Sequence, residues 1–205
     1  AGKVGISLFI NDKAVADKFV NFSFPNTIFE IIYSNPKSPA SVATEVLVGS
    51  DDSLADTLLK REFRYSPRSF FQVNIPIYEA ALQEIAGFVE CAAVDEIIDL
   101  YSGVGSIGLS VVGDKKLLTM IEIDAESTAQ AKLNMAGRKN CSVVTATAES
   151  ALDYITGNEL VILDPPRAGL HADVTDKLVE VKPQRIIYLS CNPSTQARDV
   201  SALLA

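Results

Sequence analysis

The sequence has little of what builds metal centres and disulfide frameworks. Its 205 residues include three cysteines, Cys91, Cys141 and Cys191, and a single histidine, His171. The cysteines are scattered and show neither the spacing of a zinc site nor that of a disulfide framework. We therefore expect no metal in this chain and a reducing compartment, the cytoplasm.

Long apolar runs and clusters of positive charge are also missing. No run approaches the length of a membrane-spanning helix, and no secretory signal opens the sequence, so we expect no membrane partner. Lysine and arginine number 18 against 26 acidic residues, which gives a net charge of −8. This balance argues against strong non-specific nucleic-acid binding by this chain alone. With 48% apolar residues, the composition supports a sizeable core in one domain, or in one domain and a smaller unit.

Short apolar or alternating runs dominate the first part of the chain. They cover residues 4–10, 14–20, 28–33 and 45–49, and turn-forming residues separate them at 11–12, 25–26 and 34–39. Further strand-like runs at 62–65 and 69–72 lead to a junction. This pattern predicts a small antiparallel β unit with loops. We therefore place one β-rich unit at residues 1–73 and a second domain at residues 74–205.

The second domain opens with a helix and then alternates strands with helices. Apolar residues at helical spacing predict a helix over 77–89, with Asn74 as its cap and Pro76 in its first turn. Strands are predicted at 96–101, 117–123, 142–147, 160–164 and 185–190, and helices near 105–112, 125–137, 149–155, 172–181 and 195–204. This order is typical of an α/β, doubly wound, Rossmann-like parallel sheet, in which ligands bind at the carboxyl ends of the strands.

A glycine-rich turn follows the first of these strands. Gly103, Gly105 and Gly108 match the spacing of the dinucleotide-binding fingerprint, although an ordinary tight turn would explain a lone match. A carboxylate about 20 residues further on is placed to accept the hydroxyls of an adenosine ribose. Glu122 is the candidate and Asp124 the reserve, but Asp124 also fits a helix N-cap.

Two further strand ends carry reactive or stiff corners. Asp164-Pro165-Pro166-Arg167 forms a rigid turn that fixes Asp164 at the strand tip and directs Arg167 into the cleft. Cys191 follows the last strand in Ser190-Cys191-Asn192-Pro193. A lone cysteine is often a small core residue, but here the following helix would favour a nucleophilic thiolate. His171 is expected to be a surface loop residue.

With these two corners the sequence resembles the RNA uracil-5 methyltransferases, the 5-methyluridine methyltransferases of 23S ribosomal and transfer RNA. Further matches lie at 69–74, 99–105 and 197–199, and the resemblance runs from about Glu45 to the last residue. It implies a class I methyltransferase domain, S-adenosylmethionine as cofactor and RNA as partner. The reaction implied is methylation of carbon 5 of a uridine, and of the two RNA classes we expect ribosomal RNA.

The resemblance also implies roles for individual residues. Cys191 matches the nucleophile that adds to carbon 6 of uracil. Arg167 and Arg198 match positions near the RNA or the active-site loop. The positions that match cofactor-binding residues are Gln72, Tyr101, Gly103, Ser106, Glu122, Thr147 and Asp164.

The sequence departs from the family pattern in three places. The family's general base, a glutamate, follows the motif Ala197-Arg198-Asp199, so we expect it beyond Ala205. Two more sheet strands of the family come from that same segment. The N-terminal RNA-binding barrel and the four-cysteine cluster of many members are also missing here. We therefore expect a fragment that binds cofactor but is not assured of turnover.

Other functions remain open at this point. A nicotinamide-dependent oxidoreductase would use the glycine turn and Glu122, but it leaves both corners unexplained. An amino-group methyltransferase acting on adenine or glutamine shares a Pro-Pro corner, but usually follows it with an aromatic residue where this chain has Arg167. A binding module that has lost activity is the third alternative.

Overall fold

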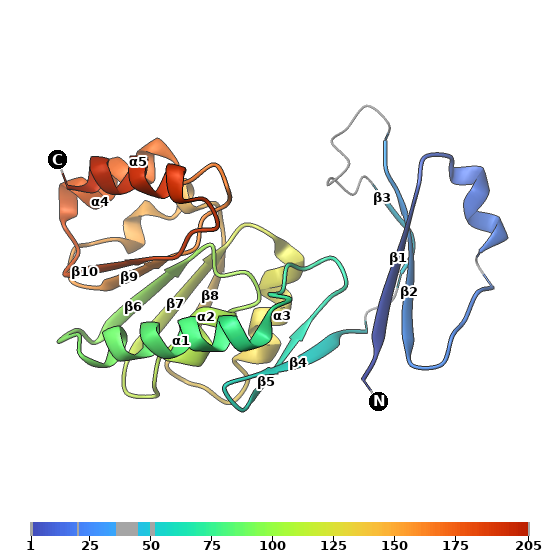
Figure 1. Ribbon diagram of the computed structural model, residues 1–205, viewed down its shortest axis with the longest axis horizontal. Coiled ribbons are helices and arrows are strands. Elements are labelled where there is room, and N and C mark those ends of the chain that lie inside the picture. The colour runs from blue at the N-terminus through green and yellow to red at the C-terminus, as the bar shows by residue number, and fades with distance from the viewer. Residues whose placement is uncertain (1, 20, 36–44, 50–51, 205) are drawn as a thin grey trace. The chain divides into compact units, whose positions relative to one another are not determined.

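The computed structural model describes residues 2–19, 21–35, 45–49 and 52–204. The chain divides into two compact units, each described here by itself (Figure 1). The first consists of residues 1–56 and 64–68, and the second of residues 57–63 and 69–205.

The first unit is built on a three-stranded sheet in the order β1 (Val4–Ile10), β2 (Thr27–Tyr33), β3 (Glu45–Val48). Strand β3 runs antiparallel to β2, as expected. Strands β1 and β2 are parallel, so the antiparallel prediction is wrong for this pair. A parallel pair needs a long crossover instead of a hairpin, and residues 11–26 provide it.

That crossover contains a 3-10 helix, η1 (Lys13–Lys18), where a strand was expected over 14–20. The Asp12 side chain accepts a hydrogen bond from the Ala14 N–H at 3.0 Å and caps the helix. Asp12 therefore begins a helix and does not close a hairpin. Val20 and the turn residues 36–39 lie outside the described part of the chain.

A two-stranded sheet, β4 (Leu54–Leu58) and β5 (Arg61–Tyr65), joins the two units in sequence. Leu59 and Lys60 turn the chain with φ values of 48° and 68°. Two central residues at positive φ are typical of a type I′ hairpin turn, which usually carries Asn or Gly. Leu-Lys lacks that signature, which is why β4 was not predicted. Residues 69–72, expected as a strand, form a loop.

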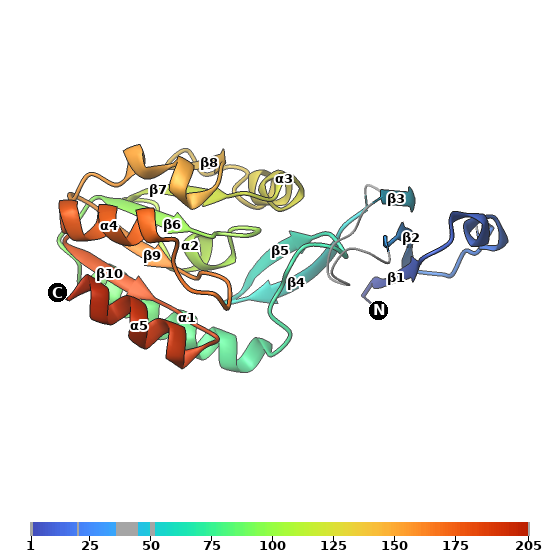
Figure 2. The same cartoon turned by 90° about the horizontal axis from the view of Figure 1, so that it is seen from above.

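The second unit contains a five-stranded parallel sheet in the order β10, β9, β6, β7, β8 (Figure 2). Its strands are β6 (Glu96–Leu100), β7 (Leu117–Glu122), β8 (Cys141–Thr145), β9 (Leu160–Leu163) and β10 (Arg185–Tyr188). Its helices are α1 (Ile75–Glu90), α2 (Ser106–Val111), α3 (Ala125–Asn134), α4 (Ala172–Val181) and α5 (Pro193–Leu203). The predicted doubly wound α/β architecture is confirmed.

Residues 149–155, expected as one helix, form two 3-10 turns, η2 (Ala148–Ser150) and η3 (Leu152–Tyr154). Ala148 and Ala151 are buried three positions apart, which matches the three-residue repeat of a 3-10 helix. The expected cap of α1 is confirmed, because Asn74 Oδ1 accepts from the Ile77 N–H at 3.4 Å.

Each face of the parallel sheet carries its own core, because successive strand residues point to opposite faces. Ile97 packs with residues of α1 and α2, such as Leu82 and Ile107. Its neighbour Ile98 packs with the buried face of α4, including Val174.

Strand order reverses between the neighbours β6 and β9, so the chain leaves these two strands toward opposite sides. Such a switch point opens a crevice at the carboxyl ends of the strands. Among the described residues, no helix is long and apolar enough to span a bilayer.

Candidate active site

A pocket lies where the ends of β6 and β9 meet the loop before α1. Five of the residues predicted to bind cofactor line it together: Gln72, Tyr101, Gly103, Ser106 and Asp164. They come from three separate stretches of the chain, and the fold gathers them at the carboxyl ends of the strands, where the sequence predicted ligand binding.

The glycine turn shapes the floor of this pocket. Gly103 and Gly105 have φ values of 55° and 82°, which residues with a side chain rarely adopt. A Cβ on Gly105 would lie 2.8 Å from the Met120 sulfur, whereas a Cβ on Gly103 would meet nothing within 4 Å. Gly105 is therefore required by packing, and Gly103 leaves open space where a ligand can approach the backbone.

The hydroxyl groups of the pocket interact with the protein in different ways. Burial raises the pKa of Tyr101, and the His171 backbone N–H opposes that rise. Ser106 Oγ lies 2.9 Å from the Tyr78 hydroxyl. Tyr78 was not predicted as a site residue, although its position one turn into α1, directly after the Gln72 loop, was a usable signal.

Glu122 is tied to the glycine turn and does not line the pocket. Its Oε2 accepts from the Gly103 N–H at 2.9 Å, and its Oε1 accepts from the Asp124 N–H at 2.8 Å. The reserve candidate Asp124 caps α3, because its Oδ2 accepts from the Ser127 N–H at 2.7 Å. Asp124 thus has the capping role that the sequence left open.

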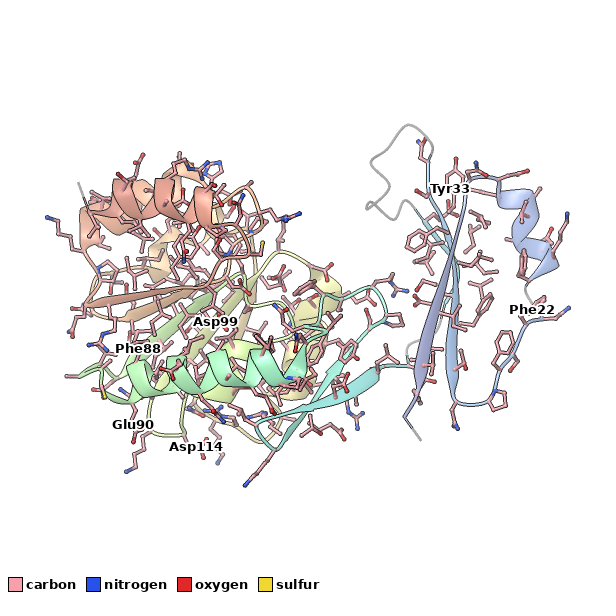
Figure 3. All side chains as sticks on the ribbon, in the orientation of Figure 1. Phe22, Tyr33, Phe88, Glu90, Asp99 and Asp114 are labelled. Carbon is pink, nitrogen blue, oxygen red and sulfur yellow. The ribbon has the colours of Figure 1, made fainter. Side chains whose placement is uncertain are left out.

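Two buried carboxyl groups in this region have raised pKa values. Burial raises the pKa of Asp164 to about 6. Burial also raises the pKa of Asp99 to about 7. The hydrogen bond that Asp99 accepts from the Gly108 N–H lowers this pKa, and repulsion from Asp164 and Glu122 raises it further. Asp99 lies deep in the sheet layer (Figure 3), and its Oδ1 has no hydrogen-bond partner among the described residues. A cationic ligand group nearby would relieve this repulsion.

Thr147 stands apart from these residues. It follows β8 and caps η2, with its Oγ1 2.6 Å from Ser150 Oγ. Thr147 does not line the pocket, so its predicted cofactor contact stays a prediction.

The two corners after β9 and β10 form one structure. The Arg167 carbonyl oxygen accepts from Asn192 Nδ2 at 3.2 Å and from Thr195 Oγ1 at 3.2 Å. Asn192 also caps α5 by accepting from the Ser194 N–H. Cys191, which directly precedes this cap, is exposed and has a free thiol. The nucleophile candidate is therefore accessible on a corner fixed to the Asp164–Arg167 corner.

Arg198 and His171 have clear local roles. The Arg198 guanidinium donates to the Asp199 carboxylate and to the Ala168 carbonyl oxygen. His171 is the N-cap of α4, because its Nδ1 accepts from the Asp173 N–H at 3.3 Å. The cap explains the histidine, which was expected only as a surface loop residue.

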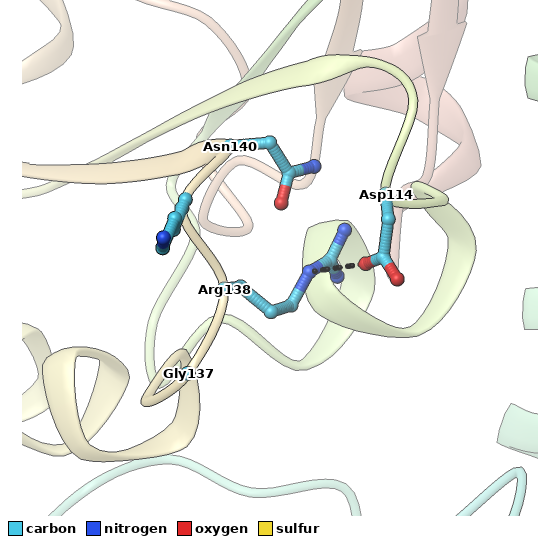
Figure 4. Close-up of a pocket in the computed structure, with 5 residues that line it drawn as sticks. Asp114, Gly137, Arg138 and Asn140 are labelled. Carbon is cyan, nitrogen blue, oxygen red and sulfur yellow. Dashed lines mark ion pairs between the residues drawn. The ribbon is translucent and has the colours of Figure 1, made fainter.

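A second hollow lies at the opposite, amino-terminal edge of the sheet (Figure 4). Its Arg138 Nε pairs with Asp114 at 3.2 Å, and Arg138 Nη2 donates to the Val112 carbonyl at 2.7 Å. Asn140 Nδ2 donates to the Lys116 carbonyl oxygen at 2.6 Å. These bonds hold the loops after α2 and α3 together, so the hollow is explained by the fold.

Comparison with known proteins identifies the relatives of this chain. The family model described as tRNA (Uracil-5-)-methyltransferase matches residues 45–205. An uncharacterised RNA methyltransferase of Enterococcus faecalis is 31% identical over 204 residues, covering 96% of this chain and 44% of the relative. A Streptococcus pyogenes relative with the same description is 34% identical over 200 residues, covering 91% of this chain and 42% of the relative. The chain thus spans less than half the length of these relatives.

Solved structures agree with this assignment. The tRNA (uracil-54, C5)-methyltransferase of Pyrococcus abyssi, in complex with S-adenosyl-L-homocysteine, superposes with a TM-score of 0.75 at 26% identity, over 98% of this chain and 50% of that one. An S-adenosylmethionine-dependent methyltransferase of Agrobacterium tumefaciens, at 11% identity and a TM-score of 0.57 over 85% of this chain and 64% of that one, shares the fold alone. The expected class I methyltransferase fold is therefore confirmed, and the chain belongs to the tRNA (uracil-5-)-methyltransferase family.

Proposed function

We propose that this chain carries the methyl-transfer part of an S-adenosylmethionine-dependent RNA (uracil-5-)-methyltransferase. The observation that carries the proposal is the hydrogen-bonded pair of corners, which fixes an exposed Cys191 beside the Arg167 turn that follows Asp164. Neither a nicotinamide-dependent oxidoreductase nor an amino-group methyltransferase has a use for a cysteine placed there.

The pocket residues suit S-adenosylmethionine. The open space in front of Gly103 admits a ligand against the backbone, and Gln72, Ser106 and Asp164 offer polar contacts. Asp164 and Glu122 raise the pKa of Asp99 by repulsion, and a ligand that carries positive charge, as a sulfonium and an amino group do, would relieve that repulsion. When bound, the cofactor supplies an electrophilic methyl group.

Cys191 would supply the covalent step. Carbon 5 of uracil is a poor nucleophile. Addition of the Cys191 thiolate to carbon 6 places the electron pair of the ring double bond on carbon 5 as an enolate, which then takes the methyl group. Removal of the carbon 5 proton re-forms the double bond and expels the thiolate. We assign that proton transfer to no residue of this chain.

The target uridine must leave its stack to reach Cys191. We propose residues 1–73 as the part that faces RNA and Arg167 as a substrate contact, since its side chain is exposed on the corner that holds Cys191. Ribosomal RNA is the substrate class we expect, and transfer RNA is the alternative that the test below distinguishes.

The test is covalent capture of RNA that contains 5-fluorouridine, in the presence of S-adenosylmethionine. Fluorine at carbon 5 cannot leave as a proton does, so capture requires the nucleophile but no general base. We expect a shifted, denaturation-resistant complex with wild-type protein and none with Cys191→Ser. Cys91→Ser is the matched control, because Cys91 is also an exposed free thiol.

Fluorinated ribosomal and transfer RNA fragments, tried in parallel, identify the substrate class. Capture that persists in Cys191→Ser would overturn the assignment of Cys191 as the nucleophile. Calorimetry with S-adenosylhomocysteine and with NAD tests the pocket independently of RNA, and binding of NAD alone would overturn the methyltransferase function.

A further inference from the structure

Asp199, on α5, is a buried carboxylate that joins three parts of the site. Its side chain is only 4% exposed. Oδ2 accepts from the Leu170 N–H at 2.9 Å and from the Tyr188 hydroxyl at 2.7 Å. Oδ1 accepts from Arg198 Nε at 2.8 Å and from Arg198 Nη2 at 2.6 Å. The carboxylate therefore has partners on the loop after β9, on β10 and on its own helix.

These partners flank the two functional corners. Leu170 lies three residues after Arg167, and Tyr188 lies three residues before Cys191. Arg198 extends the connection, because its Nη2 also donates to the Ala168 carbonyl oxygen at 2.9 Å. The same carboxylate therefore binds the segment that follows the Asp164–Arg167 corner and the segment that precedes Cys191.

The backbone is shaped to allow this contact. Gly169 has a φ of 86°, and a Cβ there would collide with the Asp199 carboxylate and the Arg198 guanidinium. Only glycine lets the loop approach so closely. The close approach at Gly169 and the buried carboxylate are thus two independent features that serve one connection.

The Arg198 guanidinium is held by its own helix and by the loop after β9. Two of its guanidinium nitrogens are bound to Asp199 and to the Ala168 carbonyl oxygen. A guanidinium held in this way contributes to position more than to contact with a phosphate. Arg167, in contrast, uses its backbone carbonyl in the corner and leaves its side chain exposed.

We infer that Asp199, with Arg198 and Tyr188, is a positioning device that sets Cys191 against the Asp164–Arg167 corner. The inference rests on the proposed function for its catalytic consequence. It assigns Asp199 and Arg198 no contact with RNA or cofactor.

The variants Tyr188→Phe and Asp199→Asn test it. Tyr188→Phe deletes one hydrogen bond from the carboxylate, and Asp199→Asn keeps the shape but removes the charge. Asp114→Asn is the matched control, because Asp114 is also a carboxylate paired with an arginine, Arg138, at 3.2 Å, in the hollow at the amino-terminal edge of the sheet. We expect both site variants to lower the rate constant of 5-fluorouridine capture about tenfold with full final amplitude, and Asp114→Asn to leave it unchanged.

The amplitude distinguishes positioning from folding. A merely structural role would lower the captured fraction while the molecules that do react keep the wild-type rate constant, and that result would overturn the inference. Arg198→Ala should slow capture without changing the salt dependence of RNA affinity, whereas Arg167→Ala should make that dependence shallower. A shallower dependence in Arg198→Ala would make Arg198 an RNA contact and overturn its assignment.

Failure of the proposed function is separable from failure of this inference. If wild-type protein captures no RNA, the proposed function fails. The positioning role of Asp199 is then tested by the rate at which Cys191 is alkylated in a Cys91→Ser, Cys141→Ser background. We expect the alkylation rate to change at least threefold in Tyr188→Phe and Asp199→Asn. Equal rates in these variants and in the parent would overturn the inference.

Discussion

Glu122 and Gly103 are joined by a hydrogen bond of 2.9 Å from the Gly103 N–H to the Glu122 Oε2. Sequence reasoning connected these two residues only through a shared ligand. The structure shows a direct contact that fixes the end of β7 to the glycine turn after β6. With Oε1 on the Asp124 N–H, one carboxylate holds two backbone segments at the mouth of the site.

Glu122→Gln should therefore weaken cofactor binding through the protein's own structure. The amide keeps only one acceptor oxygen, so one of the two N–H contacts is lost. We expect about a tenfold loss of affinity for S-adenosylhomocysteine, or ~1.4 kcal/mol, measured by calorimetry. Glu84→Gln, the same change at an exposed position of α1, is the control and should bind like wild type. Equal affinities in the two variants would contradict the role of Glu122.

Gly169→Ala should destabilise the protein more than Gly137→Ala does. Both glycines have nearly the same backbone strain, with φ values of 86° and 85°. A Cβ on Gly137 meets nothing within 4 Å, whereas one on Gly169 collides with Asp199 and Arg198. Left-handed strain alone costs about 1–2 kcal/mol, and the collision adds about 1–3 kcal/mol. Urea unfolding of both variants measures the difference, and similar midpoints would contradict the collision.

Asp99 should make stability depend on pH in an unusual direction. Burial raises the pKa of Asp99 to about 7, whereas an aspartate in the unfolded chain titrates near pH 4. Between these values the folded state holds a proton that the unfolded state has released. The contribution of Asp99 to the free energy of unfolding is therefore present below about pH 4 and is lost as the pH rises through about 7.

Asp99→Asn should remove that contribution. Its amide oxygen still accepts from the Gly108 N–H, so the fold is retained. Urea unfolding of wild type and variant at about pH 5 and about pH 8 should show a smaller loss of stability with pH in the variant. Asp164, whose raised pKa acts in the same direction, remains in both proteins. Parallel curves would show that Asp99 is not protonated in the folded state.

The sequence predicted the parallel sheet and five of the residues that line the pocket, because both depend on local signals. Apolar runs followed by glycine or proline mark the ends of β6 and β9, and parallel strands must place those ends together. Where the local signal was weak, the prediction was wrong or incomplete. The crossover after Asp12 depends on the parallel pairing of β1 with β2, which the sequence does not display. The Leu59-Lys60 turn lacks the Asn or Gly that usually marks a type I′ hairpin.

Polar side chains were harder to predict than strands, because their partners come from far along the chain. The pairing of Ser106 with Tyr78 and of Tyr188 with Asp199 could not be read from spacing. Thr147 illustrates the opposite case. A hydroxyl at the end of β8 fits a ligand contact by position, yet a short helix directly after it uses the same oxygen as a cap.

Thr195→Val should slow chemistry while leaving the protein folded. Valine keeps the shape of threonine but removes the hydroxyl that lies 3.2 Å from the Arg167 carbonyl oxygen. Asn192 still donates to that oxygen, so the corners stay connected by one bond where there were two. Loss of one such hydrogen bond costs about 1 kcal/mol of stability. We expect the rate constant of 5-fluorouridine capture to fall about fivefold, since the remaining bond leaves the Cys191 corner more mobile.

The affinity of this variant for S-adenosylhomocysteine should not change, because Thr195 does not line the cofactor pocket. If Thr195→Val lowered both the affinity for S-adenosylhomocysteine and the rate constant of capture, Thr195 would support the cofactor pocket, and the prediction would be wrong.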